Sequence, residues 1–241
     1  VKLNSKGQVD VAFQTTTSFS TGTILDIIEF QNQIVVAGTF TFGSIGNSIN
    51  RIHAVDASNG AGTSLFLNSP TFVGLNNTVR TLNVLNSTTL ILGGDFTQGV
   101  HRDSFKGQQT VTATRLALWI SGTKKFATWH GNVNGSVYTT VVIDNTIYLG
   151  GQFTTVLGTS RTNIAAVTTG SAAPSAANPS ANVMVRTLAV SGSTIFAGGD
   201  FTTFGGASRN RIAAIPSGSN TAISTWNPNS YGSVLDLHIL N

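Results

Sequence analysis

The sequence predicts an all-β fold, a single five-bladed β-propeller of four-stranded antiparallel blades. The first observation is a strand that ends in two small residues and an aromatic residue, with copies about every 50 residues, the spacing expected of propeller blades. The second is a run of four β-like segments around each copy, and the third is a fifth copy of the run's first segment near residue 241. The repeated strand reads QIVVAGTFT (33–41), TLILGGDFT (89–97), TIYLGGQFT (146–154) and TIFAGGDFT (194–202).

Each element follows from its local pattern. The N-terminal residues VKLNSKGQVDVAF are expected to form two short strands around a turn at 5–7, because glycine permits the positive φ of tight turns. We name the four strands expected in each later repeat A to D. Their expected ranges are 24–30, 79–85, 137–143, 185–191 and 234–240 for A; 34–40, 89–96, 146–153 and 194–201 for B; 51–56, 115–120, 163–167 and 211–215 for C; and 63–66, 126–129, a weak strand near 176 and 222–226 for D.

The repeats form one domain over residues 1–241, expected to be a segment of a longer chain. The fifth blade lacks a B strand, so it either has three strands or is completed by flanking residues. We favour a ring closed by pairing the N-terminal strands with the C-terminal strand, because an unpaired strand edge invites aggregation. The blade boundaries are about 24–78, 79–136, 137–184 and 185–233, with a fifth blade from 1–23 plus 234–241.

The residues shared by the repeats suit stacking. A glycine pair removes two Cβ atoms where the sheet bends or a neighbouring backbone comes close. The phenylalanine after it is expected to fill the space between blades, so replacing Phe96 or Phe201 with alanine should cost about 3–5 kcal/mol.

Composition narrows the function classes. Charged residues make up 9% of the chain, against about 25% in typical globular domains, which favours an extracellular protein. The formal charge of +4 is not clustered, so no nucleic-acid partner is expected. No apolar run approaches the ~18 residues of a membrane span, so no direct membrane insertion is expected. The histidines lack metal-binding spacing and cysteine is absent, so neither a metal nor a cofactor is expected.

The N-terminal run resembles the delta-60 repeat family of bacterial secreted and surface proteins, whose unit ends in R-L-n-x-x-G-x-x-D-x-x-F and continues to a GG-x-F strand. Later copies carry tryptophan at 129 and 226 instead of phenylalanine and approach a kelch-like pattern. The resemblance implies a β-propeller on a secreted or cell-surface protein, and it carries no catalytic residues. The matching positions of the first run are Leu3, Asn4, Gly7, Asp10 and Phe13.

The predicted binding surface lies on one face of the disc. Antiparallel strands place the B–C and D–A connections together on this face, and the connection Gln98–Thr114 is longer than its counterparts by about eight residues. Aromatic side chains among Asn, Ser and Thr suit stacking on sugar rings. The candidate binding residues are His101, Arg102, Asp103, Phe105, Lys106, Phe19, Phe72, Phe204 and Tyr231.

A second candidate site is the mouth of the central channel. Asp26 and Asp236 occupy the same place in their A strands, and Arg80 and Arg186 stand one position earlier in theirs. We expect these aspartates to pair with the arginines as a structural charge network. The alternative is a pair of glycosidase carboxylates.

Another carboxylate position follows the glycine pair. Asp95 and Asp200 stand there, but Gln152 and Thr39 replace them in other repeats, so this position is not a general acid. We therefore expect a non-enzymatic recognition or adhesion module that binds a surface glycan or protein. Flanking domains of the same chain are expected, with any homo-oligomer formed through them. The alternatives are a glycosidase-like enzyme or a structural unit of a fibre.

Overall fold

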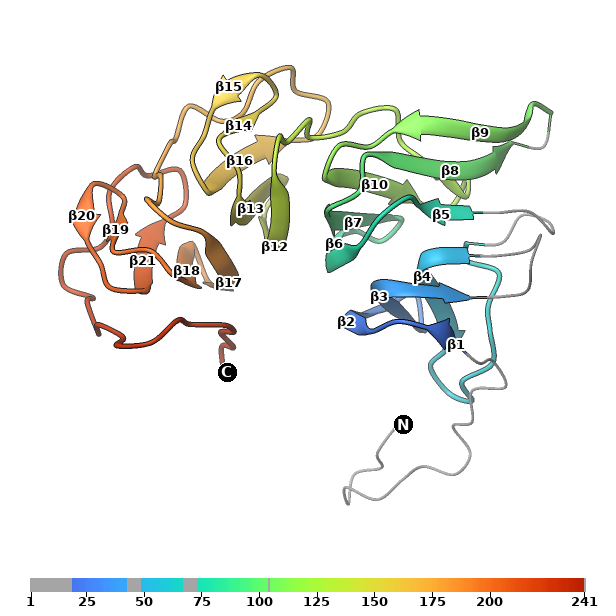
Figure 1. The fold of residues 1–241 in the computed structure, drawn as a ribbon, viewed down its shortest axis with the longest axis horizontal. Helices are drawn as coiled ribbons and strands as arrows, with labels where there is room; N and C mark the ends of the chain where they lie inside the picture. The colour runs from blue at the N-terminus through green and yellow to red at the C-terminus, as the bar shows by residue number, and fades with distance from the viewer. Residues whose placement is uncertain (1–18, 43–48, 67–72, 104, 241) are drawn as a thin grey trace.

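The computed structural model describes residues 19–42, 49–66, 73–103 and 105–240. Throughout this part of the chain the secondary structure is β-strand, turn and loop, and no helix occurs. Sheets whose strand pairs are antiparallel, with one parallel exception in the largest sheet, follow one another along an arc (Figure 1). The all-β prediction is confirmed, whereas the two strands expected within 1–13 lie outside the described residues.

The first repeat contributes to the largest sheet. Strand β2 (Ile24–Phe30) pairs with β3 (Gln33–Phe42), which pairs with β4 (Ile49–Asp56), in the predicted A–B–C order. A short strand, β1 (Phe19–Thr21), pairs with the far end of β3. The sheet continues from β4 into three further strands, β5 (Val73–Leu75), β8 (Gln98–Asp103) and β9 (Gly107–Thr112).

Among the described residues, only the second repeat forms a four-stranded sheet with all four predicted strands. Its order is β11-β10-β7-β6, so A lies at one edge and D at the other. The middle strand β7 is buried at every residue, because sheet neighbours flank it and other elements cover both its faces. Its strands are β6 (Val79–Asn86), β7 (Thr89–Gly94), β10 (Leu116–Ile120) and β11 (Lys125–Phe126).

The third and fourth repeats each form a three-stranded sheet and a small hairpin. The third contains β12 (Ser136–Ile143), β13 (Thr146–Gln152) and β16 (Ile164–Thr168), with the hairpin β14 (Thr155–Val156) and β15 (Thr159–Ser160). The fourth contains β17 (Val185–Ser191), β18 (Thr194–Gly199) and β21 (Ile212–Pro216), with the hairpin β19 (Thr203–Phe204) and β20 (Ala207–Ser208).

The predicted D strands are mostly wrong. Only β11 is a strand, and the other D segments keep little more than one backbone hydrogen bond to strand C, such as Ser175 N–H to Ala166 O at 2.8 Å and Ile223 N–H to Ala214 O at 2.8 Å. Proline cannot donate to a ladder, and Pro174 and Pro228 lie close to these two segments.

The A strands lie on the concave side of the arc, and each is next to the A strand of the following repeat: β2 beside β6, β6 beside β12 and β12 beside β17 (Figure 1). The glycine pairs permit this packing. A Cβ on Gly150 would lie 2.6 Å from Val185 Cγ1, and one on Gly151 would lie 2.1 Å from Ser136 O. The predicted close approach at the glycine pair is therefore confirmed. Equivalent contacts join Gly93 to Val137 and Gly94 to Thr78.

The C-terminal segment lies where the next A strand would lie. Val234 N–H donates to Gly199 O at 3.2 Å. Val234 also packs against Gly198 as Val185 packs against Gly150, since a Cβ on Gly198 would lie 2.5 Å from Val234 Cγ1. Leu237 N–H donates to Thr187 Oγ1 at 3.2 Å. Residues 234–240 form no strand, and the arc of sheets does not close within the described residues.

The core runs between neighbouring repeats in three apolar clusters. One cluster joins the first and second repeats, another the second and third, and another the third and fourth. The phenylalanines after the small-residue pair are buried, as predicted. They are Phe40, Phe96, Phe153 and Phe201.

Candidate functional site

The long connection of the second repeat is an ordered β-hairpin. Strands β8 and β9 pair from Gln98 with Thr112 to Asp103 with Gly107, and β8 also pairs with β5 through Val100 and Gly74. The hairpin therefore bridges the first and second repeats. The sequence located this insertion correctly, but it did not predict that the insertion would join the sheet of the preceding repeat.

Asp103 organises the tip of the β8–β9 hairpin. Its carboxylate accepts the N–H groups of Phe105 at 2.9 Å and Lys106 at 3.1 Å and forms an ion pair with Lys125. The Lys125 hydrogen bond, followed by the two backbone N–H groups, lowers the pKa of Asp103. Phe105 is 98% exposed. The tip thus presents the aromatic ring of Phe105 and the exposed side chain of Lys106, whose backbone N–H groups are bound by Asp103.

A further hairpin candidate does not face outward. His101 is buried, and its ring centroid lies 6.4 Å from that of Phe126. Burial, followed by the charge of Lys125, lowers the pKa of His101. His101 is therefore a neutral packing residue. Arg102 lies on β8 opposite Gln108.

The remaining aromatic candidates differ in how far their side chains are exposed. Tyr231 is fully exposed, at 101% of its reference area. Phe204 is fully buried, with its ring centroid 5.1 Å from that of Phe201, so its prediction as a binding residue is wrong. It turns inward because β19 docks its hairpin onto the preceding connection through a bridge to Ala181. Phe19 begins β1, and Phe72 lies outside the described residues.

The predicted charge network at the channel mouth has different partners. Arg80 Nε lies 3.0 Å from Asp95 Oδ2, and Arg186 Nε lies 2.9 Å from Asp200 Oδ1, so neither arginine pairs with Asp26 or Asp236. A β-bulge explains the error. The register skips one residue near the start of each A strand, and that residue is Arg80 in β6 and Arg186 in β17. A bulge re-aims the side chain, here towards the end of strand B in the same repeat.

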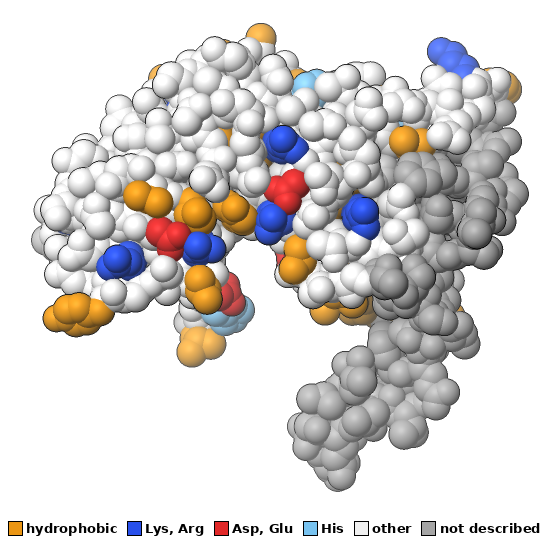
Figure 2. All heavy atoms as spheres, in the orientation of Figure 1, with side chains coloured by type: hydrophobic (Ala, Val, Ile, Leu, Met, Phe, Trp, Pro, Cys, Tyr) orange, Lys and Arg blue, Asp and Glu red, His pale blue; other side chains and the backbone are white. Residues whose placement is uncertain are grey.

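Both ion pairs hold their aspartates ionised. Burial of Asp95 opposes ionisation, but hydrogen bonds from Arg80 and Ser136 outweigh it and lower the pKa of Asp95. The hydrogen bond from Arg186 lowers the pKa of Asp200 against a smaller effect of burial. Figure 2 shows few charged side chains on this view of the molecule, and the acidic groups on its upper part adjoin basic ones. These aspartates therefore act as structural anions.

Asp26 joins the first repeat to the second. Its Oδ2 accepts the N–H of Leu82 at 2.6 Å. Thr139 Oγ1 accepts the equivalent N–H of Leu188 at 3.1 Å between the third and fourth repeats, so Asp26 has a structural counterpart. Burial raises the pKa of Asp26, hydrogen bonds oppose this, and the charge of Asp236 adds to it. Asp236 accepts a hydrogen bond from Thr187 Oγ1 at 3.4 Å.

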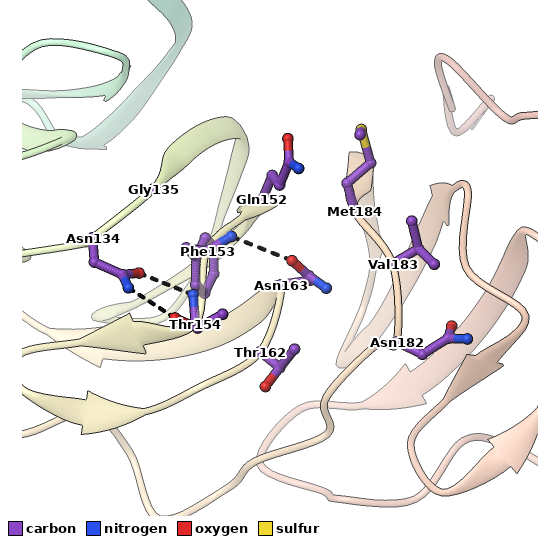
Figure 3. A pocket seen from close by; sticks show the side chains of 10 residues that line it. All are labelled: Asn134, Gly135, Gln152, Phe153, Thr154, Thr162, Asn163, Asn182, Val183 and Met184. Carbon is purple, nitrogen blue, oxygen red and sulfur yellow. Dashed lines mark hydrogen bonds between the residues drawn. The ribbon is translucent and has the colours of Figure 1, made fainter.

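A pocket of about 380 Å³ opens between the third and fourth repeats, and the sequence did not predict it (Figure 3). One wall comes from the end of β13 and the other from the connection that leads into β17. Thr162 and Asn163 lie between these walls in Figure 3. The full lining is Asn134, Gly135, Gln152, Phe153, Thr154, Thr162, Asn163, Asn182, Val183 and Met184.

An asparagine clamp stabilises one pocket wall. Asn134 Oδ1 accepts the N–H groups of Thr154 and Thr155, both at 2.9 Å, and Asn134 Nδ2 donates to Thr154 Oγ1 at 2.8 Å. Asn182 makes the same contacts with the fourth repeat. The signal in the sequence is an asparagine three residues before the first valine of an A strand, at 76, 134 and 182.

No protein-family model matches the chain, and no curated protein matches it. Within residues 19–42, 49–66, 73–103 and 105–240, no three His, Cys, Asp or Glu side chains gather as a metal site would require. The same part of the chain contains no helix that is long and apolar enough to cross a membrane.

Proposed function

We propose that the chain is a five-bladed β-propeller that recognises a ligand, without catalysis, through the face formed by its B–C and D–A connections. The observation that carries this proposal is that the residues shared by the repeats and the residues unique to one repeat have different roles. Residues shared by the repeats pack the A strands against one another, whereas the β8–β9 hairpin has no counterpart of its length in the third or fourth repeat. A rigid scaffold with one enlarged connection is a common arrangement for binding.

Two observations support the five-bladed ring. Consecutive A strands are neighbours on the concave side of the arc, as in blades stacked around an axis. Val234 occupies against Gly198 the place that Val185 occupies against Gly150. We propose that residues 234–240 become the A strand of a fifth blade and that the N-terminal residues complete it.

The carboxylates at the concave side support a recognition role over a glycosidase. A glycosidase needs two carboxyl groups that flank a substrate bond, one of them available as a general acid. Asp95 and Asp200 are held by arginines, and Asp26 accepts a backbone N–H of the next repeat. We therefore assign these groups to the joining of repeats.

The setting of the proposed module follows from composition and resemblance. We place it on a secreted or cell-surface protein, as the delta-60 likeness implies, with flanking domains of the same chain beside it. Its partner would be a glycan or protein on another surface. Its low charge would limit non-specific electrostatic binding.

The test removes the contacts of the hairpin tip and keeps its fold. The double variant Phe105→Ser/Lys106→Ser leaves Asp103 and the β8–β9 pairing in place. Glu29→Ser, which removes one exposed charge from the end of β2, is the control. We expect the double variant to lose binding on glycan and cell-surface protein arrays at least tenfold relative to wild type and Glu29→Ser. Equal binding by all three proteins, or hydrolysis of glycosides that Asp26→Asn abolishes, would overturn the proposal.

A further inference from the structure

Four residues form a charged group, which we call the rim, at the edge of the second repeat, and an equivalent rim occurs in the fourth repeat. In the second repeat Arg80 pairs with Asp95, Arg115 lies near enough to add its charge, and Ser136 at the start of the next repeat donates a hydrogen bond to Asp95. This group ties each repeat to the one that follows. In the fourth repeat the same places hold Arg186, Asp200, Arg211 and Ser233, and the same interactions recur.

The third repeat replaces all four members with uncharged residues. Tyr138 stands for the first arginine, Gln152 for the aspartate, Asn163 for the second arginine and Met184 for the serine. Tyr138 turns towards the second repeat, where its ring lies under Arg80, with 4.9 Å from the guanidinium carbon to the ring centroid. The first repeat also lacks the aspartate, but Arg51 keeps its place there and donates to Thr39 O.

The pocket opens at the site of these replacements. Gln152, Asn163 and Met184 all line it, and Figure 3 shows Gln152 and Met184 on opposite walls. Gly135 is required at the left wall in this view, because a Cβ there would lie 2.0 Å from Gln152 O. The loss of the ion pair within the third repeat therefore coincides with a cavity between the third and fourth repeats, in the size range of small-ligand sites, about 300–1,000 Å³.

The lining offers polar groups that are not used in the fold. The side chains of Gln152 and Thr162 make no hydrogen bond within the described part of the chain, whereas Asn163 is held between Phe153 N–H at 3.2 Å and Ala181 O at 2.8 Å. Met184 adds apolar surface on the opposite wall. An amide and a hydroxyl around an apolar patch match a ligand with hydroxyl groups on an apolar ring face.

We propose that this pocket is a binding site for a neutral saccharide, one or two sugar units at the end of a glycan. The inference deepens the proposed function and rests on it, because the pocket lies on the same face of the molecule. A neutral ligand is favoured since the aspartate and both arginines of the other rims are replaced here, and no lining residue of the pocket carries a charge that could pair with a charged ligand. The amide of Gln152 and the hydroxyl of Thr162 would bind sugar hydroxyls.

The chain contains one methionine, so its methyl group reports on this pocket alone. Protein labelled with ¹³C-methyl methionine gives a single Met184 signal in solution NMR. The titrants are the methyl glycosides and disaccharides of glucose, galactose, mannose and N-acetylglucosamine, with glucuronic acid and glucosamine as charged analogues. We expect a saturable shift with at least one neutral saccharide and at least tenfold weaker binding of its charged analogue.

Two variants locate the effect. Gln152→Asp/Asn163→Arg restores two of the four rim residues, the aspartate and the second arginine, and keeps the Met184 reporter. It should weaken saccharide binding at least tenfold while remaining folded. Gln108→Asp makes the same amide-to-acid change on the exposed β9 strand and should leave the titration unchanged. A Met184 signal that no neutral saccharide shifts, or equal shifts in the restored variant, would overturn the inference.

The two proposals fail separately. Loss of array binding in the hairpin-tip variant without any Met184 shift would remove the saccharide pocket and leave the recognition face. A saccharide-dependent Met184 shift with no effect of the tip variant on array binding would keep the pocket and remove the role of the hairpin.

Discussion

The contact between Gly150 and Val185 provides a quantitative test of repeat stacking. An alanine Cβ at position 150 would lie 2.6 Å from Val185 Cγ1 and 2.8 Å from Thr139 Cγ2, so both β-branched side chains would have to shift. Overpacking of this kind costs about 1–3 kcal/mol of unfolding free energy. Val185 is fully buried, and Val185→Ala removes two methyl groups at about 0.8 kcal/mol each plus a cavity contribution, about 2 kcal/mol in all.

The double variant should be more stable than the sum of these losses implies. The alanine methyl at position 150 would occupy space vacated by the Val185 methyl, so strain and cavity partly cancel. We expect a coupling free energy of at least about 1 kcal/mol, measured by urea unfolding of the four proteins of the cycle. Gly122→Ala is the control, because a Cβ there meets nothing within 4 Å and should change stability by less than about 0.5 kcal/mol. Additivity within about 0.5 kcal/mol would refute close packing of consecutive A strands.

Three other predictions concern single residues. Asp26→Thr introduces the residue found at the equivalent position of later repeats, so it should retain the hydrogen bond from Leu82 N–H and unfold in urea like wild type. Asp26→Val should lose about 1–3 kcal/mol of unfolding free energy, and equal losses in the two variants would contradict the structural role of Asp26. Burial lowers the pKa of His53 from 6.5 to about 4. The folded state therefore binds a proton less readily than the unfolded state, and about 3 kcal/mol of unfolding free energy, fully present above pH 6.5, is lost as the pH falls towards 4. His53→Ala should therefore reduce the slope of unfolding free energy against pH in that window, where His101 and His130 act in the same sense and Asp26 in the opposite one; an unchanged slope would exclude a neutral buried His53. Phe201→Ala should cost about 3–5 kcal/mol in thermal or urea unfolding, and a loss below about 1 kcal/mol would show that its ring is not part of the core.

The repeat period and the glycine pairs were readable in the sequence because stacking imposes the same requirement on every repeat. A missing Cβ at Gly150 and a valine at Val185 recur at fixed offsets, so the pattern survives drift at other positions. The outer D segments could not be predicted correctly from the sequence. Their β-like residues lie among proline and turn residues, and too few remain to sustain a ladder.

The charge partners at the channel mouth were missed because strand alternation hides a bulge. Arg80 stands one position from the place of Asp26 in the aligned repeats, yet the skipped residue turns it to Asp95. Phe204 was misassigned because the bridge that docks its hairpin onto the preceding connection depends on contacts between repeats. Periodicity within one repeat carries no information about such contacts.

The pocket was missed for a different reason. Each of the three replacements that line it resembles, when taken alone, the ordinary drift of a repeat, and Gln152 alone indicates only that its position is not a general acid. The structure brings Gln152, Asn163 and Met184 to one cavity, and only that placement gives the replacements a common meaning.

An experimental structure of a longer chain that includes these residues would test the central claim most directly. We predict radial sheets around a pore, with residues 234–240 as the innermost strand of a fifth sheet and Val234 seated on Gly198. An open solenoid, a two-layer sandwich, or a C-terminal segment detached from the fourth repeat would contradict the account.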